Sequence, residues 1–308
     1  MPTETMTFSG VYSALPTPFN AGGDQVDLET LDAQVRFQAS GGVRGVVPCG
    51  TTGETPTLWD HERRTVIERV VSIGNPLGLQ VIAGAGSNST AMAIEHQKEA
   101  EDLGVDATLQ VVPYYNKPSQ EGLFRHFHAI ADAARVPIVL YDVPSRTGTG
   151  LNVETVERLS NHPRIQAIKA ASGSFRFVSE IIARCDISVL SGDDESTFSI
   201  QCLGGVGGIS VISNLLPDAT QQLCDAVNRG DLAKARTLHA RYLPLAGALV
   251  SLESNPVPVK AAMAMVGRDS GVVRPPLAPM DESSLVLLRS ILADCGLTPV
   301  NETAVARS

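Results

Sequence analysis

Short runs of β-branched and other apolar residues alternate along this chain with longer stretches in which apolar residues recur every three or four positions. The short runs are typical of strands that are buried on both faces, and the longer stretches are typical of amphipathic helices. Turn-forming residues separate the two kinds of segment. The pattern predicts strands at residues 11–15, 45–49, 80–83, 107–112, 137–141, 165–169, 187–190 and 206–211.

Helices are predicted after each of these strands, with caps or glycine stops at their ends. They cover residues 28–39, 60–72, 90–103, 120–134, 153–160, 175–184, 194–203 and 217–228. Eight strand–helix repeats of about 20 to 35 residues are expected to close a (β/α)8 TIM barrel. A doubly wound sheet is the weaker alternative, because such sheets usually have about five or six strands.

The pattern becomes wholly helical from about Asp231 onward, with segments at residues 232–250, 257–266 and 282–293. We therefore predict an α/β chain in which a catalytic barrel occupies residues 1–230 and a C-terminal helical region occupies residues 231–308. No Gly/Ser-rich linker separates the two parts, so we do not expect the helical region to move freely.

Composition and charge narrow the classes of function. The net charge of −9 without a Lys/Arg-rich stretch lacks the basic surface that nucleic-acid binding requires. No signal segment and no membrane-length apolar stretch is present, so a cytoplasmic location without membrane association is expected. Five scattered cysteines predict neither a disulfide framework nor a zinc site, and we expect no metal and no organic cofactor.

Lys169 is the sharpest chemical feature. It ends a predicted strand, and barrel enzymes carry their reacting groups at the carboxyl ends of the strands. Burial disfavours the charged form of an amine, and only the neutral amine can add to a ketone and form an imine. If only this strand is considered, Lys169 could instead be a strand-end lysine that forms a structural ion pair.

Other polar residues at strand ends suit the same chemistry. Tyr141 ends the neighbouring strand, where its hydroxyl could move protons during imine formation or simply pack in the barrel mouth. Thr51 and Thr52, between two glycines, offer hydroxyl and N–H donors to a carboxylate, or could only cap the next helix. Arg146, on a loop stiffened by Pro144, is suited to bidentate capture of a second carboxylate, or could be a solvated surface arginine.

Several motifs in order resemble those of one family across nearly the whole chain. They are Gly50-Thr51-Thr52-Gly53-Glu54, Pro113-Tyr114-Tyr115-Asn116-Lys117-Pro118, Tyr141-Asp142-Val143-Pro144-Ser145-Arg146-Thr147-Gly148, Ser191-Gly192-Asp193-Asp194, Gly208-Ile209-Ser210-Val211 and Asn255-Pro256-Val257-Pro258-Val259-Lys260. The chain resembles the dihydrodipicolinate synthase family of pyruvate-dependent Schiff-base aldolases, which includes sialic acid lyase. The resemblance implies condensation of pyruvate with L-aspartate 4-semialdehyde in the diaminopimelate branch of lysine biosynthesis.

The resemblance also implies the catalytic residues. Lys169 would form the imine with pyruvate, and Tyr141, Thr51 and Tyr115 would form a proton relay. Tyr115 would come from a neighbouring subunit, which implies a homotetramer built as a dimer of dimers. Thr52 would join Thr51 in holding the pyruvate carboxylate.

For the rest of the substrate site, the resemblance implies that Arg146 would hold the carboxylate of aspartate semialdehyde. Gly192 and Ile209 would supply backbone groups beside the site. Thr52, Tyr115 and Arg146 favour the synthase over sialic acid lyase.

Two positions depart from the family pattern. Ala170 stands where the family usually has an acidic residue, which leaves room for a related aldolase or dehydratase acting on a sugar acid or hydroxy keto acid. Arg63 and Met92 stand where lysine-inhibited members have a histidine and a glutamate, although Asn88 and Tyr114 remain. We therefore predict insensitivity to lysine. A non-catalytic, ligand-binding barrel is disfavoured, because Lys169 and Tyr141 are both present.

Overall fold

Eight parallel strands form a closed barrel in which β8 pairs with β1, as the computed structural model of the chain shows for residues 6–298. The (β/α)8 TIM barrel predicted from the sequence is therefore confirmed. The strands are β1 (Gly10–Ala14), β2 (Gly45–Val47), β3 (Gln80–Gly84), β4 (Ala107–Val111), β5 (Ile138–Asp142), β6 (Ile165–Ala170), β7 (Ser188–Ser191) and β8 (Gly207–Ser210). Residues 1–5 and 299–308, at the ends of the two predicted regions, lie outside the described residues.

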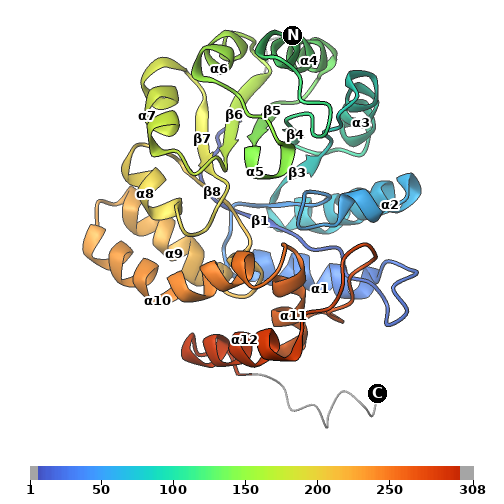
Figure 1. Cartoon of the computed structure of the whole chain (residues 1–308), viewed down its shortest axis with the longest axis vertical. Coiled ribbons are helices and arrows are strands. Elements are labelled where there is room, and N and C mark those ends of the chain that lie inside the picture. Colours follow the sequence, from blue (N-terminus) through green and yellow to red (C-terminus); the bar gives the residue numbers. More distant parts are fainter. Residues whose placement is uncertain (1–5, 299–308) are drawn as a thin grey trace.

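Helices follow the strands around the outside of the barrel (Figure 1). Side chains of Ser, Asn or Asp cap the first turn of most of the longer ones, for example Ser119 before α4 and Asn152 before α6. The helices are α1 (Leu28–Ser40), α2 (Asp60–Gly74), α3 (Thr90–Asp102), α4 (Gln120–Ala133), α5 (Pro144–Thr147), α6 (Val153–Ser160), α7 (Phe175–Arg184), α8 (Thr197–Cys202), α9 (Pro217–Asn228), α10 (Leu232–Ser251), α11 (Val257–Met265) and α12 (Glu282–Asp294).

Two predicted segments differ from the structure. Residues 144–147, expected as a loop, form the single helical turn α5, which begins with Pro144 because proline already has a helical φ and needs no N–H there. Helix α8 begins at Thr197 rather than at residue 194. The Asp194 carboxylate instead accepts the backbone N–H groups of Val211 and Ile212, at 2.8 and 2.9 Å, and so holds the segment after β8.

Alternation along each strand divides the core into an inner and an outer layer. On β6, Ala167 belongs to the cluster inside the barrel, together with Tyr141 and Leu190. Ile168 and Ala170 belong to the apolar layer between the strands and the surrounding helices. The register of β6 thus turns Lys169, between these two outward residues, toward the barrel interior.

The C-terminal helices α10, α11 and α12 pack beside α8, α9 and the end of β8, in orange to red at one side of Figure 1. Their apolar core includes Leu245, Leu249 and Met263 and also reaches Ile212 and Leu215, which follow β8. This shared core ties the helical region to the barrel, while the predicted boundary at residue 230 stays a prediction. Within residues 6–298, no helix has both the length and the apolar character needed to cross a membrane.

Candidate active site

Lys169 lies near the carboxyl end of β6, between Tyr141 of β5 and Leu190 of β7 in register. Its residue is 7% exposed, and its Nζ lies 4.2 Å from the centre of the Tyr141 ring. Among residues 6–298 it has no hydrogen bond and no ion pair. The alternative of a structural ion pair at Lys169 is therefore wrong.

Lys260, the other buried lysine, shows the contrast. It is fully buried, and desolvation lowers the pKa of its ammonium. Its Nζ donates to the carboxylate of Glu54 at 2.7 Å and to the carbonyl of Thr17 at 2.8 Å. Lys260, a buried lysine with a structural role, therefore has oxygen partners, whereas Lys169 has none among residues 6–298.

Gly192, the residue after β7, lies beside the aliphatic part of the Lys169 side chain. A Cβ at residue 192 would lie 3.1 Å from Cγ and Cε of Lys169 and 2.7 Å from the Cβ of Ala171. Glycine is thus required to leave room for the lysine. Ile209 of β8 is buried in the same inner cluster as Tyr141. The structure therefore brings Lys169, Tyr141 and Gly192 together at the carboxyl ends of β5, β6 and β7, and Ile209 lies near the carboxyl end of β8.

The loop after β2 carries the predicted carboxylate site. Thr51 is half-buried and Thr52 is buried. The hydroxyl of Thr52 accepts a hydrogen bond of 3.0 Å from the side-chain amide of Asn255, and the next carbonyl, of Gly53, accepts the hydroxyl of Thr17 at 2.7 Å. These contacts hold the loop, and the side-chain hydroxyl of Thr51 has no hydrogen bond among residues 6–298.

Arg146 projects from α5 and is exposed. Its Nη2 lies 3.4 Å from the backbone carbonyl of Asn255. Asn255 therefore contacts both predicted carboxylate-binding residues, Thr52 with its side chain and Arg146 with its backbone. Sequence reasoning did not assign a role to Asn255, because no periodicity predicts which barrel loop a residue in the C-terminal region will contact.

Tyr115 is not brought to this site by its own chain. Its side chain is 90% exposed, and its φ of 74° lies in the left-handed region, which is strained for a residue with a bulky side chain. Three hydrogen bonds hold the loop around it: Asn116 N–H to Tyr114 O and Asn116 Nδ2 to Asn88 O, both at 2.9 Å, and Asn88 Nδ2 to Tyr114 O at 3.2 Å. The strained backbone thus holds an aromatic ring out in solvent.

Comparison with known proteins agrees with this geometry. The model of the dihydrodipicolinate synthetase family matches residues 7–294. The chain belongs to this family. A relative from Geobacter sp. (strain M21), named 4-hydroxy-tetrahydrodipicolinate synthase, is 50% identical over 93% of this chain and 98% of its own.

Solved structures give the same result. A dihydrodipicolinate synthase of Acinetobacter baumannii in complex with pyruvate has a TM-score of 0.92 and 40% identity, over 94% of this chain and all of its own. A second, described as the first monomeric dihydrodipicolinate synthase variant, has a TM-score of 0.91 and 39% identity, over 94% and 97%. As a dihydrodipicolinate synthetase family member, the chain is a lyase.

The departure of Ala170 from the usual pattern of the dihydrodipicolinate synthetase family lies outside the barrel interior. Ala170 is 3% exposed and packs in the outer layer with Val178 of α7 and Ile200 of α8. A side chain at residue 170 therefore faces away from Lys169. Within residues 6–298, no group of three or more His, Cys, Asp or Glu side chains is arranged to hold a metal ion.

Asp142, next to Tyr141, is a buried carboxyl group that faces away from the barrel interior. Burial raises its pKa from 3.8 to about 6, against the opposing effect of the Leu151 N–H that it accepts at 2.9 Å. Between these two pH values the folded chain binds more protons at this position than the unfolded chain. Its contribution to the free energy of unfolding therefore falls as pH rises through this window and stays low above it.

Asp142→Asn is therefore expected to stabilise the protein at pH 8 by about 2 kcal/mol, because the amide keeps the acceptor for Leu151 and removes the buried charge. The gain should disappear at pH 4, where Asp142 is protonated in the folded chain. Urea unfolding of both proteins at one protein concentration measures the difference. An equal difference at the two pH values would contradict this assignment.

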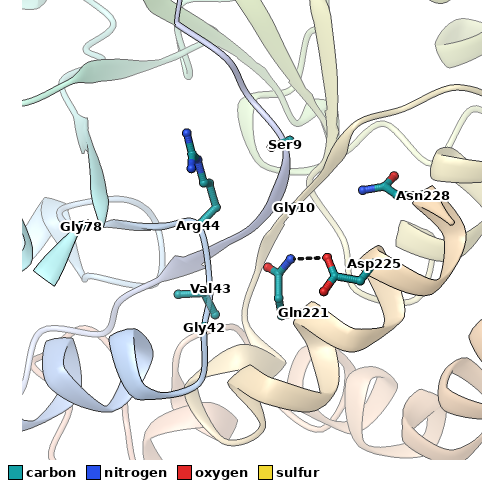
Figure 2. A pocket seen from close by; sticks show the side chains of 9 residues that line it. All are labelled: Ser9, Gly10, Gly42, Val43, Arg44, Gly78, Gln221, Asp225 and Asn228. Atoms are coloured by element: carbon teal, nitrogen blue, oxygen red, sulfur yellow. Dashed lines mark hydrogen bonds between the residues drawn. The ribbon is translucent and has the colours of Figure 1, made fainter.

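A cavity of about 300 Å³ lies at the opposite end of the barrel, where β1 and β2 begin (Figure 2). Gln221 of α9 crosses it, accepting from Val11 N at 3.0 Å and donating to Asp225 at 2.8 Å. Arg44 at its edge donates to Gln80 at 3.3 Å. Gln221, Asp225 and Arg44 are thus paired within the protein, and this end of a barrel contributes to stability rather than to catalysis.

Proposed function

We propose that this chain condenses pyruvate with L-aspartate 4-semialdehyde through a Schiff base on Lys169, in lysine and diaminopimelate biosynthesis. The observation that supports this most is the buried amine of Lys169, which has no hydrogen bond or ion pair with any described residue, at the carboxyl end of the barrel strands. A relative binds pyruvate in its solved structure. No cofactor enters the proposed reaction.

In the proposed reaction, the neutral Nζ of Lys169 adds to the C2 carbonyl of pyruvate, and the carbinolamine loses water to give the imine. Loss of a C3 proton gives the enamine, which attacks the aldehyde carbon of the second substrate. The amine of that substrate then displaces Lys169 and closes the ring. Tyr141, whose ring lies 4.2 Å from Nζ, would carry protons in these steps together with Thr51 and with Tyr115 of a neighbouring copy.

The two carboxylates are assigned to different groups. Thr51 and Thr52 would bind the pyruvate carboxylate through hydroxyl and backbone N–H donors. Arg146, exposed at the rim and 3.4 Å from Asn255 O, would bind the carboxylate of the incoming aldehyde. Gly192 and Ile209 would border the reacting atoms.

Tyr115 would act in a neighbouring copy of the chain, because it projects into solvent from its own. Trp59, Met92 and Tyr114 are also large apolar residues with exposed surface on the loops and helices that follow β2, β3 and β4. Large apolar residues exposed on consecutive strand–helix units are typical of a surface that pairs with another subunit. We propose a dimer through this face within a homotetramer, located in the cytoplasm.

The experiment that tests the function is reduction with borohydride in the presence of pyruvate, followed by peptide mass spectrometry. A coupled assay with aspartate semialdehyde is run beside it. A pyruvyl adduct on Lys169 with turnover is the expected result. An adduct without turnover would indicate another aldehyde, such as a sugar acid derivative, and no adduct would exclude the imine mechanism.

Mixing two impaired variants tests the origin of Tyr115. Tyr115→Phe should lower kcat by about a hundred-fold, and Lys169→Met should be inactive. In mixed dimers one site has Lys169 from one chain and Tyr115 from the other, so random mixing should restore about a quarter of the wild-type activity. No recovery in mixtures shown to contain mixed dimers would place Tyr115 in its own subunit's site.

Lysine is expected not to inhibit the enzyme. Arg63 is buried, forms an ion pair with Glu99 and donates to Gly84 O at 3.3 Å. Its guanidinium is therefore already paired within the chain, and its positive charge would repel the ammonium groups of lysine. Met92 offers no carboxylate to the ammonium groups of lysine. The activity of the wild type should therefore stay unchanged in millimolar lysine. The same assay on an Arg63→His/Met92→Glu variant compares the inhibition of the two proteins by lysine. Inhibition of the wild type at sub-millimolar lysine would refute the prediction.

A further inference from the structure

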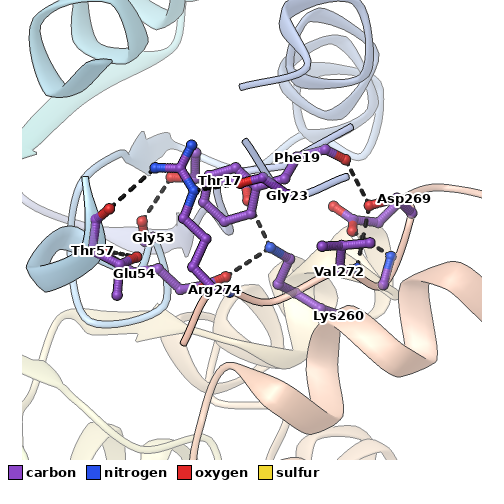
Figure 3. A network of polar contacts seen from close by, with 12 residues as sticks. Thr17, Phe19, Gly23, Gly53, Glu54, Thr57, Lys260, Asp269, Val272 and Arg274 are labelled. Carbon is purple, nitrogen blue, oxygen red and sulfur yellow. Dashed lines mark hydrogen bonds and ion pairs between the residues drawn. The ribbon is translucent and has the colours of Figure 1, made fainter. Parts of the chain in front are cut away.

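A buried network of polar contacts joins the loop after β2 to the C-terminal helical region (Figure 3). Its centre is Glu54, which follows the Thr51-Thr52-Gly53 segment and whose side chain is completely buried. One carboxylate oxygen accepts Lys260 Nζ at 2.7 Å, and the other accepts the backbone N–H of Arg274 at 2.9 Å. Both donors come from residues more than 200 positions away along the chain.

Lys260 connects the network to the loop by a second route. Its Nζ also donates to Thr17 O, and the hydroxyl of Thr17 donates to Gly53 O, at 2.8 and 2.7 Å. Lys260 Nζ also lies 4.2 Å from the centre of the Phe19 ring. The ammonium therefore bridges two segments that border the carboxylate-binding threonines.

The backbone of Glu54 needs such an anchor. Its φ of 54° lies in the left-handed region, which costs a residue with a side chain about 1 kcal/mol or more. Surrounding contacts must hold such a conformation in place. Arg274 contributes on the far side of the turn, where its guanidinium donates to Thr57 O at 3.1 Å and pairs with Glu62 at 2.6 Å.

We infer that Lys260 and Glu54 are positioning residues for the pyruvate carboxylate site: through their buried ion pair, the C-terminal region sets the placement of Thr51 and Thr52. This rests on the proposed function. Asn255, five residues before Lys260 and just before α11, contacts Thr52 and Arg146. A single segment, residues 255–260, thus contacts Thr52 and Arg146 through Asn255 and anchors the loop after β2 through the pair of Lys260 with Glu54.

A double substitution separates positioning from stability. Lys260→Met leaves Glu54 buried without its cation and should destabilise the fold. Glu54→Gln/Lys260→Met removes both charges while the glutamine oxygen can still accept Arg274 N–H, so its stability should recover. The double variant should nevertheless need about ten-fold more pyruvate than the wild type for half-maximal adduct formation. The reason is that its loop has lost the bridge from Lys260 to Thr17.

Glu54→Asp is a second variant that keeps the charge and draws the carboxylate back by one methylene group. It should raise the KM for pyruvate while changing kcat by less than about three-fold. Glu101→Gln is the matched control: the side chain of Glu101 is 1% exposed and pairs with Arg135 on the outer side of the barrel. This control should lower stability and leave the KM unchanged.

All measurements are made on the full chain, well below the melting temperature of each variant. Wild-type half-saturation in both Glu54→Asp and the double variant, with an adduct still on Lys169, would overturn the positioning role alone. Absence of an adduct in the wild type would overturn the proposed function and this inference together. A raised half-saturation in either variant, without a change in the Glu101→Gln control, supports it.

Discussion

Lys169→Met is expected to abolish turnover, with kcat/KM lowered by on the order of 10⁴-fold or more, because the nucleophile that forms the imine is removed. No pyruvyl adduct should appear after borohydride reduction. Methionine keeps the apolar stem beside Gly192, and Lys169 has no hydrogen bond or ion pair to lose among residues 6–298. Thermal stability should therefore be equal to or higher than that of the wild type.

Lys260 supplies the control for this experiment. It is the more deeply buried of the two lysines and is held by Glu54 and Thr17, so the wild-type adduct should map to Lys169 and never to Lys260. Lys260→Met should lose stability, whereas Lys169→Met should not. Residual synthase activity in purified Lys169→Met, beyond any trace of wild-type enzyme, would refute the role of Lys169.

Tyr141→Phe is expected to lower kcat by about 10² to 10³-fold while the adduct on Lys169 still forms, more slowly. The phenyl ring keeps the packing against Lys169, and the hydroxyl of Tyr141 has no hydrogen bond within the described part of the chain. The change should therefore affect proton transfer and not folding. Single-turnover trapping of the imine, compared with steady-state turnover, measures the two effects separately.

Tyr12→Phe is the matched control, since Tyr12 also belongs to the inner cluster of the barrel. Its hydroxyl donates to Gln80 at 2.6 Å near the opposite end. Losing that hydrogen bond should cost about 1 kcal/mol of stability with kcat unchanged. Equal kcat values in Tyr141→Phe and the wild type would remove Tyr141 from the mechanism.

The order of strands and helices follows from local pattern, because buried strands and amphipathic helices have different hydrophobic periods. Element ends were less predictable. Helix α8 begins later than its apolar pattern suggests because Asp194 is held by backbone N–H groups after β8. Arg146 lies on a helical turn rather than a loop. The first outcome depends on a contact with the segment after β8, and the second depends on the backbone of a single proline-initiated turn. The hydrophobic period of the sequence predicts neither.

The candidate site shows the same division. Placing Lys169, Tyr141 and Gly192 at neighbouring strand ends requires only the strand count and the side-chain alternation of a barrel. Asn255 and the pair of Lys260 with Glu54 could not be placed in this way. Their partners on the loop after β2 lie more than 200 residues away in sequence, and the direction in which the C-terminal helices pack is not encoded in any local period.

Sequence alone was sufficient for the eightfold repeat, the lysine at the end of the sixth strand and the family, because each is recognised from short segments, taken in their order along the chain. The isolation of the Lys169 amine, the outward direction of Ala170 and the exposure of Tyr115 depend on how distant elements pack. Whether a side chain is buried or has a hydrogen-bond partner depends on residues that are distant in the sequence and close in the folded chain. The environment of these side chains is therefore determined only once β8 has paired with β1 and the C-terminal region has packed against the loop after β2.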